Sequence, residues 1–373
     1  MAANKNQHFV PKIHFKPFSK DGENACVNLL VLSNKKLVSN APIKNQCSKN
    51  YFYGKDLELE KAFQELEGYY GQIIAKVQTN PYDVLDDDLQ FLRFFAYLQS
   101  VRTEAAVRRN SAFFTEMMSK AYAENPEFLP EYETTDEDIV RLCLSGVDAF
   151  CEHSADLRTC LILNRSKTEF ITSDDPAIIT NRFHAQKEFL KHLGVGISAA
   201  GAMLFMPLSP KICFVAYDQN VYSADHRKAH IITTSKPSDI CAINELQMLK
   251  ANKSIYFSSW ELGEELKTHF TGMEATRPTT WHEVHVAVED ENFRDATHKR
   301  YKVIDLETET AGERDALIHV VTRYPQPSRW FSALRLRTQP KIFDTHTGQG
   351  ILRPGSVAHA SYLMRNYSMG SGS

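Results

Sequence analysis

The spacing of apolar residues predicts helices in the first part of the chain. Apolar side chains recur at helical intervals over residues 55–77 and again over residues 80–122. Three consecutive aspartates at 86–88 mark the beginning of the second helix, because carboxylates are favoured at the positive end of the helix dipole. A third helix is expected over residues 136–154. The first half of the chain is therefore predicted to be mainly helical.

Elsewhere the pattern changes to that of strands. Residues 25–40 predict a β-hairpin that turns at Asn34 and Lys35. Residues 157–179 predict two strands joined by a tight turn, and residues 202–218 predict a second pair that is broken by prolines. Regular alternation of strand and helix is missing, which favours an α+β fold over a doubly wound parallel sheet.

The fold class expected is α+β, with a helical region followed by a mainly antiparallel sheet and a β-rich C-terminal extension. Residues 237–259 predict a helix that leads into a strand or loop. We expect an α+β core domain over residues 1–276 and a β-rich extension or small lobe over residues 277–366. Residues 367–373 have the composition of a linker or tag remnant.

Composition excludes few function classes. Of 373 residues, 43% are hydrophobic and 24% are charged, which is ordinary for a globular protein. The formal net charge of −3 does not suggest binding of polyanions over the whole surface, although a local basic groove remains open. No apolar run reaches the roughly 18 residues that cross a membrane, so no membrane partner is expected. Seven scattered cysteines without a C-x-x-C pair, and an opening without a signal peptide, predict a cytoplasmic protein with reduced thiols.

Arg102 is the most informative single residue. It falls near the centre of the apolar stripe of the second predicted helix, with Gln99 at the edge of that stripe. A buried guanidinium keeps its proton and needs a partner. That partner is either a carboxylate of the protein, which gives a structural ion pair, or an anion of the substrate in a polar cleft. A side chain that extends outward to solvent would remove both alternatives.

The segment "TSDDP" offers a partner for that arginine. Ser173, Asp174 and Asp175 lie where a predicted strand ends, and Pro176 favours an extended backbone before it. Two adjacent acids can bind a divalent cation or act as acid and base. The alternative is a turn in which these side chains cap their own backbone, and the spacing alone favours that alternative.

Four further positions are candidates for a polar site. His8, next to Gln7, can be an acid, a base or a ligand near neutral pH. Glu67 lies near the apolar stripe of the first helix and is the helical glutamate best suited to a buried role. Ser209 lies between two prolines in "PLSP", which we interpret as a shaped loop, since no nucleophile elbow surrounds it. Zinc-binding H-E-x-x-H and phosphate-binding P-loop patterns are missing from the sequence.

The order of several segments resembles the bacterial domain-of-unknown-function family 4238 over about residues 7–256. The segments are "QHFVPKIHFKPF", "FYGKDLELEKAFQELEG", "FLRFFAYLQSVRTEAAVR", "FITSDDPAII", "MPLSP" and "NELQMLKANKSIY". The resemblance implies a cytosolic prokaryotic or phage-related protein without a settled activity. Its motif positions coincide with His8, Gln99, Arg102 and Asp174, whereas Asp175 stands where the family often carries asparagine.

From these residues we expect the N-terminal segment to pack across the helices and to place His8 in one cleft with Arg102 and Asp174. The first functional hypothesis is an enzyme acting on a phosphodiester or nucleotide, such as a toxin-like or phage-defence nuclease that cleaves RNA. His8 would be the acid or base, Arg102 would hold phosphate, and Asp174 with Asp175 or Glu67 would bind Mg²⁺. The substrate-binding residues of this hypothesis are Gln7, Gln99, Ser173 and Ser209.

The second hypothesis is a non-catalytic binding or regulatory module. In it the same polar residues form a buried structural network, and function lies on the surface or in the C-terminal extension, which would then bind a protein partner.

Overall fold

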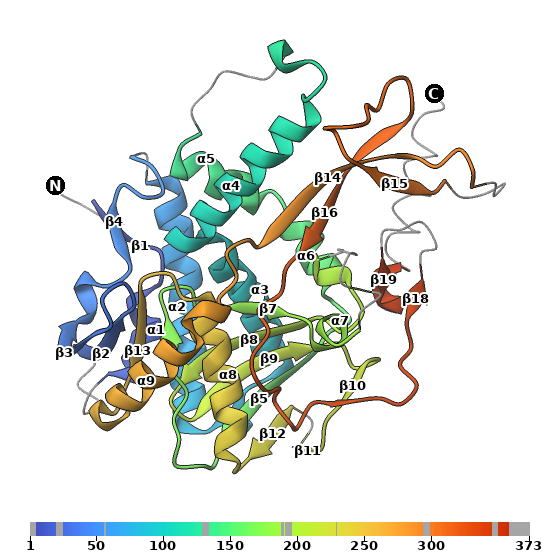
Figure 1. Ribbon diagram of the computed structural model, residues 1–373. Helices are drawn as coiled ribbons and strands as arrows, with labels where there is room; N and C mark the ends of the chain where they lie inside the picture. Colours follow the sequence, from blue (N-terminus) through green and yellow to red (C-terminus); the bar gives the residue numbers. More distant parts are fainter. Residues whose placement is uncertain are drawn as a thin grey trace, which may run out of the picture.

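The computed structural model describes residues 5–19, 25–55, 57–128, 134–187, 190, 196–228, 230–293, 299–344 and 350–357. The predicted tail at 367–373 lies outside these residues. The fold is α+β, as predicted, with helices on both faces of a central sheet (Figure 1). The helices are α1 (Lys12–Phe15), α2 (Glu58–Thr79), α3 (Asp86–Arg102), α4 (Glu104–Ala121), α5 (Asp136–Leu144), α6 (Val147–His153), α7 (Arg182–Ala185), α8 (Pro237–Lys250) and α9 (Gly263–Met273).

The long helix predicted over residues 80–122 is wrong, because the chain forms two helices there. Thr103 has an extended backbone between α3 and α4, and its Oγ1 accepts a hydrogen bond from Ala106 N. This cap begins α4 in a new direction. The third predicted helix is likewise divided, since α5 ends at Leu144 and α6 begins at Val147. Apolar periodicity indicated helix in both regions and did not indicate the breaks.

The central sheet has the strand order β11-β12-β5-β9-β8-β7. The strands are β5 (Arg158–Asn164), β7 (Ile178–Thr180), β8 (Met203–Ser209), β9 (Ile212–Tyr217), β11 (His226–Lys228) and β12 (Ile231–Thr234). The pairs are antiparallel except for the parallel pair of β12 with β5. The predicted strand pair over residues 202–218 is confirmed by β8 and β9.

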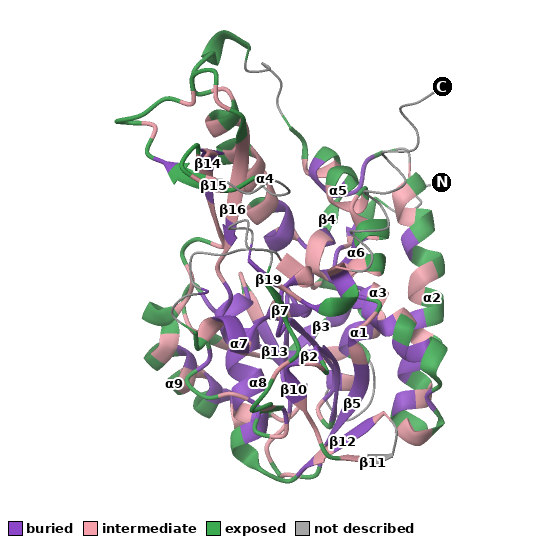
Figure 2. Cartoon of the chain, turned by 90° about the vertical axis from the view of Figure 1, so that its right-hand side faces the viewer, coloured by how far each residue is buried: buried purple, intermediate pink, exposed green. Residues whose placement is uncertain are grey.

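Both faces of the central sheet are covered. Alternate residues of β5 illustrate this: Leu161 and Leu163 pack in a cluster with α2 and α3, whereas Cys160 and Ile162 pack in a cluster with α8. The position of α8 inside the molecule explains why almost all of its residues are buried, whereas α2 keeps an exposed outer face (Figure 2). The sheet is thus the middle of three layers.

A second sheet has the order β3-β2-β13-β6, and its strands are β2 (Cys26–Val31), β3 (Lys36–Pro42), β6 (Thr172–Ser173) and β13 (Ser254–Phe257). The predicted hairpin over residues 25–40 is confirmed, with Lys35 at positive φ in its turn. The tight hairpin predicted over residues 157–179 is wrong, because β5 pairs with β9 and β12 while β6 pairs with β13 of the other sheet. Asp174 and Asp175 therefore follow a strand of the second sheet.

The C-terminal part has two differently placed regions. The predicted β-like runs form an antiparallel sheet of β14 (His282–Glu289), β15 (Tyr301–Ile304) and β16 (Ala316–Thr322), which packs against α4. The chain then returns across α8, where Ser328 N and Oγ donate hydrogen bonds to the buried carboxylate of Glu245. The β14–β16 sheet therefore lies against α4, whereas the chain that follows it packs on α8.

Three two-stranded pairings complete the described strands. They are β1 (Asn6–His8) with β4 (Ser48–Asn50), β10 (Tyr222–Ser223) with β17 (Arg335–Leu336), and β18 (Phe343–Asp344) with β19 (Ile351–Leu352). The second pairing joins the C-terminal extension to the core, which is a further reason why the extension does not stand apart.

A buried polar network centred on Arg102 joins the N-terminal segment to α2 and α3. The Arg102 side chain is fully buried, donates to Gln99 Oε1 at 2.5 Å, and forms an ion pair with Glu67 at 3.0 Å. Its guanidinium also lies 4.5 Å from the centre of the Phe63 ring. Gln99 in turn donates to Phe9 O at 3.3 Å. The protein itself supplies the counter-charge that a buried arginine requires.

Replacing Arg102 by Ala is expected to lower the free energy of unfolding by about 3–5 kcal/mol, because Glu67 and Gln99 lose their partner inside the protein. Chemical denaturation followed by circular dichroism measures this change. Arg141→Ala, which removes an exposed arginine paired with Glu137 on α5, is the matched control and should leave the midpoint almost unchanged. An equal midpoint for Arg102→Ala and the wild type would contradict a structural role.

Candidate anion-binding site

The structure does not bring His8, Arg102 and Asp174 together. Strand β1 directs Gln7 inward and His8 toward the surface, since successive residues of a strand face opposite sides. The His8 ring lies 3.1 Å from Lys44 O and is only half-buried, and Arg102 is held by Glu67 and Gln99. The predicted shared cleft is therefore wrong.

His14 is the histidine that reaches the surroundings of Arg102. It is fully buried between the hydroxyl groups of Tyr70 and Thr172, at 2.8 and 2.7 Å. Burial, with a smaller contribution from the positive charge of Arg102, lowers the pKa of His14 to about 3. The imidazole is therefore uncharged at neutral pH and serves as a hydrogen-bonding core residue.

The residues predicted to bind substrate are buried and have partners within the protein. Gln7 Oε1 accepts from Tyr53 N at 2.6 Å, and Ser173 Oγ donates to Gln247 Oε1 at 2.7 Å. Ser209 Oγ accepts from Lys211 N at 3.3 Å in the turn after β8. Gln99 belongs to the Arg102 network. These four side chains hold segments of the chain together.

Asp174 fixes the turn that follows α8. Its two carboxylate oxygens accept from Asn252 N at 2.9 Å and from Lys253 N at 2.7 Å. Burial raises the pKa of Asp174 to about 6, although these backbone hydrogen bonds oppose the rise. The carboxylate thus acts as an internal brace for residues 251–253.

Asp175 is fully buried between two basic side chains. Its Oδ1 lies 3.1 Å from Lys250 Nζ, at the end of α8, and its Oδ2 lies 2.6 Å from Arg109 Nη1, on α4. Thr103, the residue that caps α4, donates to Oδ1 at 3.1 Å. Burial lowers the pKa of Lys250 to about 8, with the negative charge of Asp175 opposing the change. One carboxylate therefore sets the positions of both cations.

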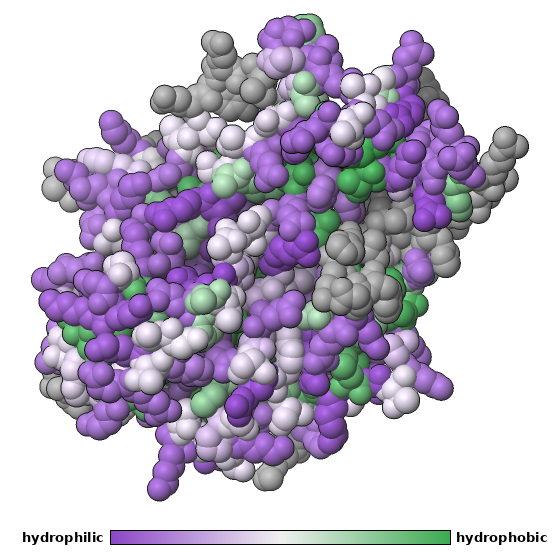
Figure 3. All heavy atoms as spheres, in the orientation of Figure 1, coloured by the Kyte–Doolittle hydropathy of each residue, from purple (hydrophilic) through white to green (hydrophobic). Residues whose placement is uncertain are grey.

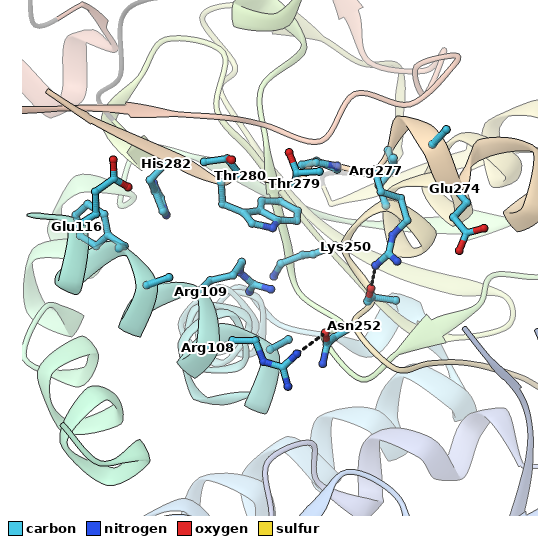
Figure 4. Close-up of a pocket in the computed structure, with 18 residues that line it drawn as sticks. Arg108, Arg109, Glu116, Lys250, Asn252, Glu274, Arg277, Thr279, Thr280 and His282 are labelled. Carbon is cyan, nitrogen blue, oxygen red and sulfur yellow. Dashed lines mark hydrogen bonds between the residues drawn. The ribbon is translucent and has the colours of Figure 1, made fainter. Parts of the chain in front are cut away.

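A cavity of about 710 Å³ lies beside these two cations (Figure 4). Three parts of the chain form it: α4, the turn after α8, and the segment that joins α9 to β14. Among its lining residues four are basic and two are acidic. They are Arg108, Arg109, Lys250 and Arg277, against Glu116 and Glu274. The lining therefore carries an excess of positive charge within a protein of net charge −3.

Several polar atoms of the residues that line this cavity have no hydrogen-bond partner within the part of the chain that the structure describes. Arg277 donates to Ala251 O through Nη2, but its buried Nε has no hydrogen-bond partner among the described residues. The same holds for Asn252 Nδ2. A buried donor without a partner is costly, and these two atoms, themselves shielded from solvent, belong to side chains that line the cavity.

His282 lines the same cavity from the first position of β14. Burial, and next the positive charge of Arg109, lower the pKa of His282 below its usual value. Its Nδ1 is buried and has no hydrogen-bond partner within the described part of the chain. Since Nδ1 is shielded from solvent, His282 is a candidate general base through its other ring nitrogen.

The acids predicted to hold Mg²⁺ do not converge. Glu67 pairs with Arg102, Asp174 accepts backbone amides, and Asp175 faces two cations. Among the residues that the structure describes, no group of three His, Cys, Asp or Glu side chains is arranged to hold a metal ion.

Sequence patterns did not single out the residues that line the cavity. Arg108 and Arg109 lie on the helix next to Arg102 but outside an apolar stripe, where arginines are ordinary. His282 follows Trp281 in "WHEVHV", a β-like run in which His282 and His285, three residues apart, face opposite sides. One feature of the sequence could have indicated these residues: the run of polar and aromatic residues "RPTTWH" at the predicted domain boundary.

Comparison with known proteins identifies the family. The family profile described as protein of unknown function (DUF4238) matches residues 6–261, and the chain belongs to this family. No curated protein and no solved structure gives a match. The described helices include none with the length and apolar character required to span a membrane.

Replacing Asp175 by Asn is expected to lower the free energy of unfolding by about 3–5 kcal/mol, because Lys250 and Arg109 lose their common counter-charge in a buried place. Urea denaturation measures the loss. Asp136→Asn, which removes an exposed ion pair with Lys49, is the control and should unfold at nearly the wild-type midpoint. A stable Asp175→Asn variant would show that the two cations need no fixed partner.

Proposed function

We propose that the protein is an enzyme that cleaves RNA, with the phosphodiester bound in the cavity beside Asp175. The observation that carries the proposal is the gathering of four basic side chains and a histidine with a lowered pKa around one cavity. Cleavage of RNA would suit the toxin-like or phage-defence role expected from the sequence. Family membership supports neither this role nor any other, since the family has no described function.

The geometry suits a phosphate group. A guanidinium presents its donors as a planar fork that matches two phosphate oxygens. Arg109 is held in place by Asp175 at 2.6 Å, so little side-chain freedom is lost when it binds. Arg108 and Arg277 border the turn at residues 251–252 that Asp174 braces, and the Arg108 Nη1 lies 3.4 Å from Asn252 Oδ1. Phosphate would thus meet preorganised donors.

This mechanism requires RNA, because the attacking group is the 2′-hydroxyl of the ribose. His282 would remove the proton of a ribose 2′-hydroxyl, and the 2′-oxygen would attack the adjacent phosphorus. The arginines would stabilise the charge that develops on the phosphoryl oxygens. The bond to the 5′-oxygen breaks, that oxygen takes a proton from water in the open cavity, and His282 returns its proton to solvent. The products are a 2′,3′-cyclic phosphate and a free 5′-hydroxyl.

The second candidate is a binding or regulatory module that holds a phosphate-bearing ligand without turnover. It is favoured by one observation: Arg102, Gln99 and Glu67, which the enzyme hypothesis first assigned to the site, form a buried structural network. A protein partner for such a module has no obvious apolar docking surface on the face drawn in Figure 3, where hydrophilic residues dominate and hydrophobic ones are scattered.

His282→Ala is expected to reduce kcat on single-stranded RNA by about 10²–10⁴-fold while leaving substrate affinity nearly unchanged, because only the base is lost. The measurement is single-turnover cleavage with and without Mg²⁺ and with analysis of the product ends. His285→Ala, three residues along the same strand, is the matched control.

Three results would contradict this mechanism: full activity in His282→Ala, cleavage of a strand that contains only 2′-deoxyribose, or an absolute need for Mg²⁺. If the purified protein binds RNA and never cleaves it, the binding module is the better description.

The pH profile of kcat/KM is expected to have two limbs. The rate rises with pH as His282 loses its proton, and this limb lies below pH 6.5 because the pKa of His282 is lowered. The rate falls as the pH passes about 8, where Lys250 loses its charge and the cavity becomes less positive. Lys250→Met should lower kcat/KM at pH 7 and remove the upper limb. The control Lys253→Met, which alters an exposed lysine, should retain the upper limb. An upper limb that persists in Lys250→Met would contradict its assignment to Lys250.

A further inference from the structure

The walls of the cavity come from two parts of the chain. Arg108, Arg109 and Lys250 lie within the residues that match the family profile, 6–261. The opposite wall, from Glu274 to His282, lies beyond the match. The phosphate-binding cations are thus mostly a feature of the family region, while the second wall belongs to the C-terminal extension.

The second wall carries an aromatic surface. Trp281 lines the cavity, and the guanidinium of Arg109 lies 5.1 Å from the centre of its ring. That contact fixes the indole next to a cation whose other partner is Asp175. Phe113, which also lines the cavity, lies 5.0 Å from the His282 ring between centroids. Aromatic rings and arginine forks in one cavity are the combination with which proteins hold unstacked bases.

Hydrogen-bonding groups accompany the aromatic rings. Thr279 and Thr280 are exposed and line the same wall, and Figure 4 shows them beside His282 and across from Arg109 and Lys250. The volume of about 710 Å³ is in the range of sites that enclose a nucleotide-sized ligand. The cavity therefore has space for a base as well as for its phosphate.

We infer that the wall formed by residues 277–282 recognises a nucleobase of single-stranded RNA by stacking on Trp281, while Arg108, Arg109 and Lys250 bind the adjoining phosphate. This inference rests on the proposed function and adds its substrate class: an unpaired nucleotide, which a duplex cannot present to the cavity. Selectivity among RNA substrates thereby belongs to the extension of this chain and not to the region that the family profile matches.

The test compares two short oligonucleotides that carry 2′-O-methyl riboses and so are not cleaved. One has all its bases and the other has an abasic residue at its centre, with identical phosphates. The wild-type protein is expected to bind the first about ten- to a hundredfold more tightly, as measured by fluorescence anisotropy. Trp281→Ala should abolish this difference and leave the affinity for the abasic strand within threefold of wild type.

Two further variants make the test specific. Trp281→Phe keeps an aromatic face and should retain most of the preference for the intact strand. Trp260→Ala, which removes an exposed tryptophan outside the cavity lining, should retain all of it. Circular dichroism and the unfolding midpoint establish that each variant is folded.

The outcomes separate the two proposals. Base recognition is overturned, and the phosphate site is left standing, if the wild type binds the intact and abasic strands with equal affinity. It is also overturned if folded Trp281→Ala loses affinity for the two strands by the same factor. Failure of the wild type to bind either strand overturns the proposed function together with this inference. Equal binding of duplex and single-stranded RNA also overturns the inference, because a paired base cannot stack on Trp281.

Discussion

The contact of Asp175 with Lys250 and Arg109 is the interaction on which the site depends. A carboxylate that is fully removed from water needs compensation, and here two cations from separate helices provide it. The same carboxylate accepts a hydrogen bond from Thr103, the residue at which α3 ends and α4 begins. The direction of α4, the end of α8 and the strand end at β6 are therefore fixed relative to one another at one point. The cavity lies beside this point, between α4, the turn after α8 and the segment that joins α9 to β14.

The molecule contains two buried groups of charged side chains, one around Arg102 and one around Asp175, and they differ in whether a ligand can reach them. Around Arg102 the protein supplies a carboxylate, an amide and aromatic rings, and the cavity lining does not include the arginine. Around Asp175 the cations border a cavity, and nearby donors such as Arg277 Nε lack partners in the described residues. Burial of an arginine is thus a weak indication of function by itself. Each group has a buried donor without a hydrogen-bond partner among the described residues, Arg102 Nη1 in the first and Arg277 Nε in the second. What distinguishes the second group is that Arg109 and Lys250 line a cavity that a ligand can enter.

The C-terminal extension is part of the site. Its first residues, Arg277 to His282, form one wall of the cavity, and β14 then packs with its sheet against α4. Further along, Ser328 is tied to Glu245 on α8, and Leu336 pairs with Tyr222 of the core. These contacts attach the chain that follows the wall to α4, to α8 and to the core. The cavity is thus built from side chains of the region that the family profile matches, such as Arg109 and Lys250, and from side chains of the added segment, such as Trp281 and His282.

The sequence by itself determined the α+β class, the hairpin before the helices and the need of Arg102 for an internal partner, because each follows from residues that are close in the chain. Helical periodicity, strand alternation and turn residues act over a few positions. The sequence also indicated Glu67 as the glutamate for a buried role, and that residue does pair with Arg102.

Only the tertiary structure decided which distant groups meet. Asp175 lies 66 residues from Arg109 and 75 from Lys250, and no local pattern specifies such a pairing. The tertiary structure also decided which histidine lies near Arg102. One residue of register in β1 turns Gln7 inward and His8 outward, and His14 of the following helix is the buried one. The cavity arises where helices and strands from separate parts of the chain leave space between them. Its chemistry is therefore a property of packing, whereas the elements that form it are properties of the sequence.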